Sequence, residues 1–317
     1  MNSLEKAANI VLKQCMDLKE KENLLIVFDA NKQGIADVFL KNAKKIIENA
    51  FSIEMPVAKV NGEEPPLEVA EEMKKYDVVL LVTTKSLSHT NARRDACKGG
   101  GRIASMPGIT KDMMERALTA DYDMIAETDK RIVEALKGKR VLRVTTTLGT
   151  DITFFKNNLF DDDGIYHKKG SFGNLPAGEV GFAPVENKTN GVFVIDKTMA
   201  GIGRLKSSIK FTVKDGYVVN IEGGDDAEKL NEMLKGFNDK NVYNVAEFSI
   251  GTNPNAKITG LTLEDEKVLG TIHIALGDNT SYPGGNTKAP MHLDGVISKP
   301  TIFADDEKIM ENGNLLV

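Results

Sequence analysis

Two uninterrupted apolar segments, separated by helical patterns, dominate the first half of the sequence. NLLIVFDA (23–30) and YDVVLLVTT (76–84) are apolar at nearly every position, which is typical of strands buried on both faces of a parallel sheet. The stretch GIADVFLKNAKKIIENA (34–50) between them has helical periodicity. Further strands are predicted at 52–60, 102–108 and 139–147. This alternation predicts an α/β domain over residues 1–147, with a doubly wound, flavodoxin-like parallel sheet.

The sequence changes character near residue 148. Helical periodicity disappears apart from 225–237, glycine becomes frequent, and apolar and polar residues alternate in several runs. One of them, SIKFTVKDGYVVNIEGG, contains a KDG sequence that is typical of a hairpin turn. We therefore expect a second, mainly β domain over 148–317, and the candidate metal ligands described below all fall within it.

Composition excludes several classes of protein. The formal net charge of −5 over 317 residues argues against a general nucleic-acid surface. No apolar run approaches the roughly 20 residues that a membrane-spanning helix needs. The two cysteines, Cys15 and Cys97, are far apart in the sequence and form no C-x-x-C motif. We expect a cytoplasmic protein that binds neither nucleic acid nor membranes.

The last fifth of the chain carries a candidate metal-binding group. Two of the four histidines, His273 and His292, lie there together with Asp294. In the sequence His-Leu-Asp an extended backbone sends His292 and Asp294 to the same face of a strand, so His273 must come from a neighbouring strand. Imidazole and carboxylate groups both bind divalent metals, although a His-x-Asp sequence is also common by chance.

Two glutamates in apolar surroundings extend this group. Glu179 lies in NLPAGEVGFAP and Glu247 lies in VAEFSIG, where an unpaired buried charge would be costly. Glu179 could also be an exposed loop carboxylate, and Glu247 could belong to a buried ion pair. If all five residues are ligands, they suffice for two divalent ions with a bridging water. Such carboxylate-rich ligation suits zinc, cobalt or manganese.

Four ordered motifs resemble the M29 metallopeptidases, the aminopeptidase T group. They are LPAGEVGFAP, AEFSIGTNPNAKITG, EDEKVLGTIHIALGDN and HLDGVISKPTI. The resemblance implies that a dinuclear metal site is held by five ligands, which are Glu179, Glu247, His273, His292 and Asp294. It implies a metal-dependent aminopeptidase that hydrolyses the first peptide bond of a substrate with a free N-terminus. It also implies a homodimer.

The implied hydrolysis also needs a group at the oxyanion and a general base. The family has a tyrosine that assists at the oxyanion, for which Tyr282 is the nearest candidate, and Glu247 or Glu179 could act as the general base. A related branch with this fold consists of ring-opening dioxygenases that act on dihydroxypyridines. They use one Fe(II) held by two histidines and an aspartate, and His273, His292 and Asp294 would suffice for that site. A metal-binding protein without catalysis is the third alternative.

Overall fold

The computed structural model describes residues 2–317, which form two compact units. Unit 1 extends to Ala126 and includes Asp162–Ala177, and unit 2 comprises Glu127–Asp161 and Gly178–Val317. The domain boundary expected at residue 147 therefore falls within unit 2. Within residues 2–317, no helix is both long and apolar enough to cross a membrane.

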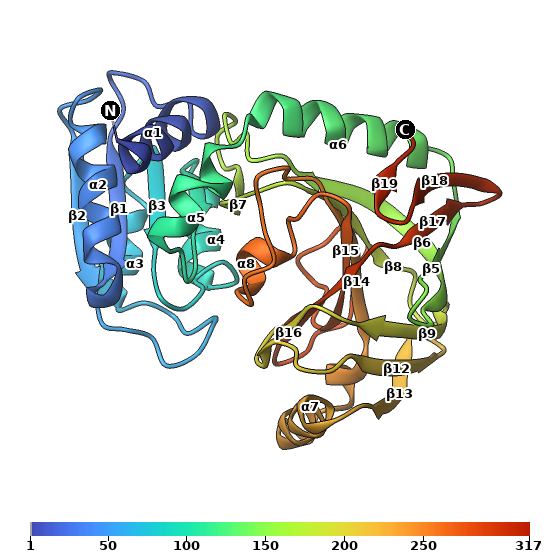
Figure 1. Ribbon diagram of the computed structural model, residues 1–317. Helices are drawn as coiled ribbons and strands as arrows, with labels where there is room; N and C mark the ends of the chain where they lie inside the picture. Colours follow the sequence, from blue (N-terminus) through green and yellow to red (C-terminus); the bar gives the residue numbers. More distant parts are fainter. Residues whose placement is uncertain (1) are drawn as a thin grey trace. The chain divides into compact units, whose positions relative to one another are not determined.

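Unit 1 is built on a sheet of five strands, all paired in parallel in the order β2-β1-β3-β4-β7 (Figure 1). These strands are β1 (Leu24–Asp29), β2 (Ala50–Met55), β3 (Val78–Val82), β4 (Arg102–Ser105) and β7 (Phe172–Asn174). The helical elements are α1 (Ser3–Ile10), η1 (Val11–Cys15), η2 (Ala30–Lys32), α2 (Gln33–Ala43), α3 (Leu67–Met73), α4 (Asn91–Lys98), α5 (Lys111–Glu115) and η3 (Ala117–Thr119). This order is the doubly wound arrangement predicted from the sequence.

Alternate residues of the central strands pack into two separate apolar cores. In β1, Leu24 and Ile26 belong to the core that contains residues of α1 and α2, whereas Leu25 and Val27 belong to the core that contains residues of α3 and α4. The same alternation continues in β3. Because both faces are covered, nearly every position of these strands must be apolar, which explains the uninterrupted runs in the sequence.

Unit 2 contains a 14-stranded sheet, whose main path runs β11-β10-β16-β15-β14-β8-β6-β5-β17-β18-β19. The strands of this path, in chain order, are β5 (Val141–Thr145), β6 (Asp151–Asp162), β8 (Glu179–Pro184), β10 (Thr198–Met199), β11 (Gly203–Arg204), β14 (Val245–Gly251), β15 (Thr271–Gly277), β16 (His292–Ser298), β17 (Thr301–Ala304), β18 (Glu307–Glu311) and β19 (Asn314–Leu315). Off the path lie β9 (Asn190–Ile195), β12 (Ile209–Lys214) and β13 (Tyr217–Glu222). The helical elements are α7 (Asp225–Gly236), η4 (Lys240–Tyr243), α8 (Thr262–Asp265) and the larger part of α6 (Tyr122–Leu136).

The predicted fold class is confirmed, with one difference in the placement of a strand. The segment predicted at 139–147 forms β5, but β5 pairs antiparallel with β6 and β17 instead of joining the parallel sheet. The fifth parallel strand is instead β7, which pairs with β4. A run of apolar residues indicates that a strand is buried but does not specify its neighbours, so this exchange was not visible in the sequence.

Candidate metal centre

All five predicted metal ligands lie on one face of four adjacent antiparallel strands. In the register of β8, β14, β15 and β16, Gly251 is paired with Glu179, Glu247 and Asp294 are both paired with Ala275, and His292 is paired with Gly277. Paired residues share a face of the sheet, and side chains alternate along a strand. The prediction that His273 comes from the strand next to His292 and Asp294 is therefore confirmed.

Small residues on the same face leave room between these side chains. Gly181, Ser249 and Ala275 occupy positions among the charged groups. A Cβ at Gly181 would lie 1.8 Å from Ser249 Oγ and 2.8 Å from the ring of Phe160. The opposite face carries apolar residues of the unit 2 core, such as Phe182, Phe248 and Ile274. The strands thus combine a packed apolar face with a polar face that is shaped around the cluster.

The two histidines face the carboxylates through their Nε2 atoms. His273 Nε2 lies 3.2 Å from Glu179 Oε2 and 3.2 Å from Glu247 Oε1. His292 Nε2 lies 3.1 Å from Glu247 Oε2 and 3.2 Å from Asp294 Oδ1. Glu247 therefore links both imidazoles, and Ser249 Oγ donates a hydrogen bond of 2.6 Å to its Oε1 atom.

The backbone fixes the orientation of His292. Its Nδ1 atom lies 2.7 Å from the carbonyl oxygen of Asp278, which can only accept a hydrogen bond. In the neutral imidazole the proton is therefore on Nδ1, and Nε2 presents its lone pair to the cluster. An imidazole held in this way by a backbone carbonyl is a common arrangement for a metal ligand.

The charged groups shift one another's pKa values strongly. Burial alone would lower the pKa of His273, but hydrogen bonds to Glu179 and Glu247 outweigh it and raise that pKa well above its usual value. Burial would also lower the pKa of His292, but the nearby Asp294 and Glu247 outweigh it and raise that pKa well above its usual value. Burial would raise the pKa of Glu247, but hydrogen bonds from both histidines hold it well below the usual range. Without a metal, the carboxylates thus retain protons on the imidazoles as their counter-charge.

Two further buried residues that the sequence did not single out belong to the cluster, namely Glu266 and Lys267. Lys267 Nζ lies 2.6 Å from Glu179 Oε1 and 2.9 Å from Glu266 Oε1. Burial raises the pKa of Glu266 to about 8, against the opposing effect of the Lys267 charge. The available signal was the run EDEK (264–267), which ends three residues before the strand of His273, but four consecutive charged residues are more often a solvated turn.

Gly251 has no side chain, which allows the segment that carries Glu266 and Lys267 to lie close to strand β14. A Cβ at Gly251 would lie 2.4 Å from the Val268 carbonyl oxygen and 2.9 Å from that of Glu266. Because both atoms belong to the backbone, the contact could be relieved only by moving the segment that carries Lys267.

We therefore expect Gly251→Ala to lower the free energy of unfolding by about 1–3 kcal/mol, the usual cost of overpacking. Thermal unfolding of the purified protein measures this. Gly34→Ala is the matched control, because a Cβ at Gly34 in helix α2 meets nothing within 4 Å. An unfolding temperature of Gly251→Ala equal to that of the wild type would show that the segment does not depend on this close approach.

The donor set fits a divalent cation. Three groups of potential ligand atoms each lie within 4.8 Å of one another: Glu179, Glu247 and His273; Glu247, His292 and Asp294; and Glu266, His273 and Asp294. The buried Nδ1 atom of His273 has no hydrogen-bond partner, and the Oε2 atoms of Glu179 and Glu247 contact only the imidazole Nε2 atoms. Mixed nitrogen and oxygen ligation of this kind is suited to iron, zinc or manganese rather than to calcium.

Tyr282 lies beside this cluster, with an aromatic neighbour on its other side. Its hydroxyl is 3.4 Å from His292 Nε2, and its ring stacks on Phe160 with 4.7 Å between the centroids. Tyr282 and Phe160 are both half-buried. The Tyr282 ring therefore lies between Phe160 and His292, whose ring centroid is 5.6 Å from its own.

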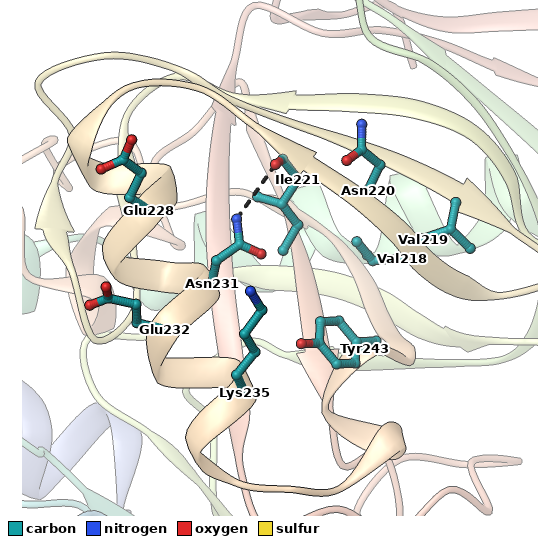
Figure 2. Close-up of a pocket in the computed structure, with 9 residues that line it drawn as sticks. All are labelled: Val218, Val219, Asn220, Ile221, Glu228, Asn231, Glu232, Lys235 and Tyr243. Carbon is teal, nitrogen blue, oxygen red and sulfur yellow. Dashed lines mark hydrogen bonds between the residues drawn. The ribbon is translucent and has the colours of Figure 1, made fainter.

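A separate surface pocket of about 670 Å³ lies between strand β13 and helix α7 (Figure 2). Its lining includes Val219, Glu228, Lys235 and Tyr243, and it shares no residue with the metal-binding cluster. Asn231 donates a hydrogen bond to the carbonyl oxygen of Ile221 across it. The pocket lacks histidines and aspartates and does not extend the candidate metal centre.

The fold of the whole chain is shared with two solved structures. One is 2,5-dihydroxypyridine dioxygenase from Pseudomonas putida KT2440, with a TM-score of 0.81 and 20% identity over 100% of this chain and 98% of that chain. The other is wild-type AmpT from Thermus thermophilus, with a TM-score of 0.73 and 15% identity over 99% of both chains. The aminopeptidase-like architecture expected from the sequence motifs is thus confirmed at the level of the fold.

The sequence itself identifies the family. Residues 3–317 match the family described as NicX, 2,5-dihydroxypyridine 5,6-dioxygenase, and the chain belongs to this family. It is 27% identical over 255 residues to the 2,5-dihydroxypyridine 5,6-dioxygenase of Pseudomonas putida KT2440, which covers 75% of this chain and 71% of that protein.

This family membership corrects the function expected from the motifs. The prediction of an aminopeptidase, and with it of a hydrolase of the M29 family, is wrong, because the matched family and the curated relative are both dioxygenases. The expected pair of zinc, cobalt or manganese ions is likewise not supported, whereas groups of metal-binding residues are present. The five predicted ligands suit either chemistry, so their order along the chain could not separate the two families.

Proposed function

We propose that the protein is a metal-dependent dioxygenase that opens the ring of a dihydroxypyridine. Membership of the dioxygenase family over residues 3–317 is the observation that carries this proposal. The site is consistent with it, because two histidines and one aspartate project from adjacent strands on the same face of the sheet. That combination with open positions is the facial triad of non-haem Fe(II) oxygenases.

In this proposal His273, His292 and Asp294 would hold one Fe(II), with Asp294 as the central residue because it shares one group of potential ligand atoms with His292 and another with His273. The bound iron would supply the redox chemistry that lets dioxygen react with an electron-rich aromatic ring. The hydrogen bond to the Asp278 carbonyl orients His292 for this role. Stacking on Phe160 would hold Tyr282 beside the metal, with its hydroxyl placed to hydrogen-bond a bound substrate.

Glu247 is the residue that we propose as the proton acceptor. It is 1% exposed, and its two carboxylate oxygens lie within 3.2 Å of His273 and His292. In the metal-free protein, hydrogen bonds from both histidines hold the pKa of this carboxyl well below its usual range, and a bound metal would displace the protons that make these bonds. An ionised carboxylate in this position can accept the proton of a substrate hydroxyl as the substrate binds.

The proposed reaction is tested by following substrate and dioxygen together. Protein stripped with a chelator and reloaded with Fe(II) is mixed with 2,5-dihydroxypyridine in an oxygen-electrode cell, while loss of the aromatic absorbance is recorded. We expect one dioxygen consumed for each ring lost, and no reaction in the metal-free or zinc-loaded protein. Loss of neither substrate nor dioxygen with iron bound would contradict the proposal.

Metal affinity is expected to rise with pH across the neutral range. The raised pKa values of His273 and His292 favour the protonated form of both imidazoles in the metal-free protein. Each must lose its proton to become a ligand, so affinity should increase as the pH approaches those raised values. Release of two protons corresponds to an affinity gain of up to about 100-fold per pH unit.

Calorimetric titration at several pH values, in buffers with different ionisation enthalpies, measures both the affinity and the number of protons released. Affinity that is independent of pH would show that the two histidines do not give up protons to the metal. The homodimer implied by the sequence motifs stays a prediction.

A further inference from the structure

The cluster contains a buried positive charge of its own. The side chain of Lys267 is 1% exposed, and its ammonium group bonds one oxygen of Glu179 at 2.6 Å and one oxygen of Glu266 at 2.9 Å. These are the distances of charge-assisted hydrogen bonds. A buried ammonium group is costly unless it is paired, so Lys267 depends on its contacts with these two side chains, and Glu179 at 2.6 Å supplies the opposite charge.

The carboxylates that Lys267 bonds are those that a second metal ion would need. Glu179 and Glu266 each belong to a group of potential ligand atoms, and because His273 and Asp294 would hold the first ion, a second ion would depend on Glu179, Glu247 and Glu266. A second divalent ion would compete with the ammonium group for oxygens of Glu179 and Glu266. It would also face the positive charge of Lys267 at close range, where charges interact strongly in a buried site.

The backbone holds Lys267 in this position. Its N–H donates to the carbonyl oxygen of Glu264 at 3.0 Å, and its own carbonyl oxygen accepts from the Asn253 N–H at 2.8 Å. The close approach to Gly251 described above constrains the same segment from the side of the sheet. The ammonium group is therefore a fixed part of the site and not a mobile surface charge.

We infer that the Lys267 ammonium takes the place of a second cation and limits the cluster to a single divalent ion. The inference rests on the proposed function, because the proposed dioxygenase reaction requires the first ion. It explains how a chain that has all five ligands expected of a dinuclear site would still bind one metal, with His273, His292 and Asp294 as its ligands and Glu179 engaged elsewhere.

The test is a count of metal ions in wild-type protein and in Lys267→Met. Both are stripped with a chelator and titrated with Co(II), and the bound metal is determined by calorimetry and by elemental analysis after gel filtration. We expect one ion per chain in the wild type and two in Lys267→Met. Removing one charge about 4 Å from a second ion should tighten binding at that position on the order of 1,000-fold.

Two control variants separate the charge of Lys267 from other effects. Lys210→Met removes an exposed lysine that is paired with Glu222 at 3.3 Å on the strands β12 and β13, and it should leave one ion per chain. Lys267→Arg retains the positive charge and should also bind one ion. If Lys267→Met does not fold, Lys267→Gln replaces it with the same expectation.

Two ions in the wild type, or a single ion in a folded neutral variant of Lys267, would overturn the inference. The metal count and the dioxygenase assay together distinguish failure of this inference from failure of the proposed function. Wild-type protein that binds no metal would overturn both. One ion in the wild type and two in the neutral variant, without any consumption of dihydroxypyridine, would support the inference and contradict the proposed function.

Discussion

Replacing His292 by alanine is expected to abolish both iron binding and ring opening. His292 is the ligand whose orientation is fixed by a backbone carbonyl, and its Nε2 atom lies within 3.2 Å of two carboxylates. Substitutions of outer residues that only orient a ligand usually cost about 10–100-fold in metal affinity. Loss of a direct ligand should exceed that range and bring the iron content close to zero at micromolar metal.

Iron content after gel filtration and oxygen uptake measure this result. His167→Ala is the matched control, since His167 is an exposed histidine of unit 1 and should keep full iron content and activity. If His292→Ala retained iron at the wild-type level, the cluster would have to bind metal through other ligands, such as Glu179 and Glu247.

Glu247→Gln is expected to separate metal binding from turnover. The amide keeps the size of the side chain but cannot accept a proton, so the three proposed ligands remain while the proposed base is lost. Loss of a general base typically lowers the rate about 100- to 10,000-fold. We therefore expect iron content near the wild-type value together with a fall of this size in turnover.

The control for charge is Glu222→Gln, which removes an exposed carboxylate of strand β13 and should leave turnover unchanged. Ser249→Ala removes only the hydroxyl that donates to Glu247, and a smaller loss is expected. Iron lost in parallel with activity in Glu247→Gln would instead identify Glu247 as a metal ligand.

Periodicity in the sequence predicts the parts of this structure that depend on burial. The apolar runs of β1 and β3 predict strands covered on both sides, and His-Leu-Asp predicts that His292 and Asp294 share a face. Strand β7 is only three residues long, too short for any pattern to show. Its place in the parallel sheet and the antiparallel pairing of β5 depend on contacts between distant segments.

The sequence also predicts only part of the candidate site. Apolar neighbours mark Glu179 and Glu247 as unusual, but Glu266 and Lys267 lie in a charged run whose burial only the folded structure reveals. The choice between a hydrolase and a dioxygenase likewise could not be made from the five ligands alone. Both reactions need buried nitrogen and oxygen donors, so the distinction rests on the relationship over the full chain and on the groups that surround the ligands.

The proposed reaction inserts both atoms of dioxygen into a dihydroxypyridine. The most direct measurement is mass spectrometry of the product formed by the Fe(II)-loaded protein from 2,5-dihydroxypyridine under ¹⁸O₂. We predict a ring-opened product in which both added oxygens are labelled, with allowance for exchange of carboxyl or carbonyl oxygen with water. Oxygen derived only from water, or an unaltered ring, would contradict the account.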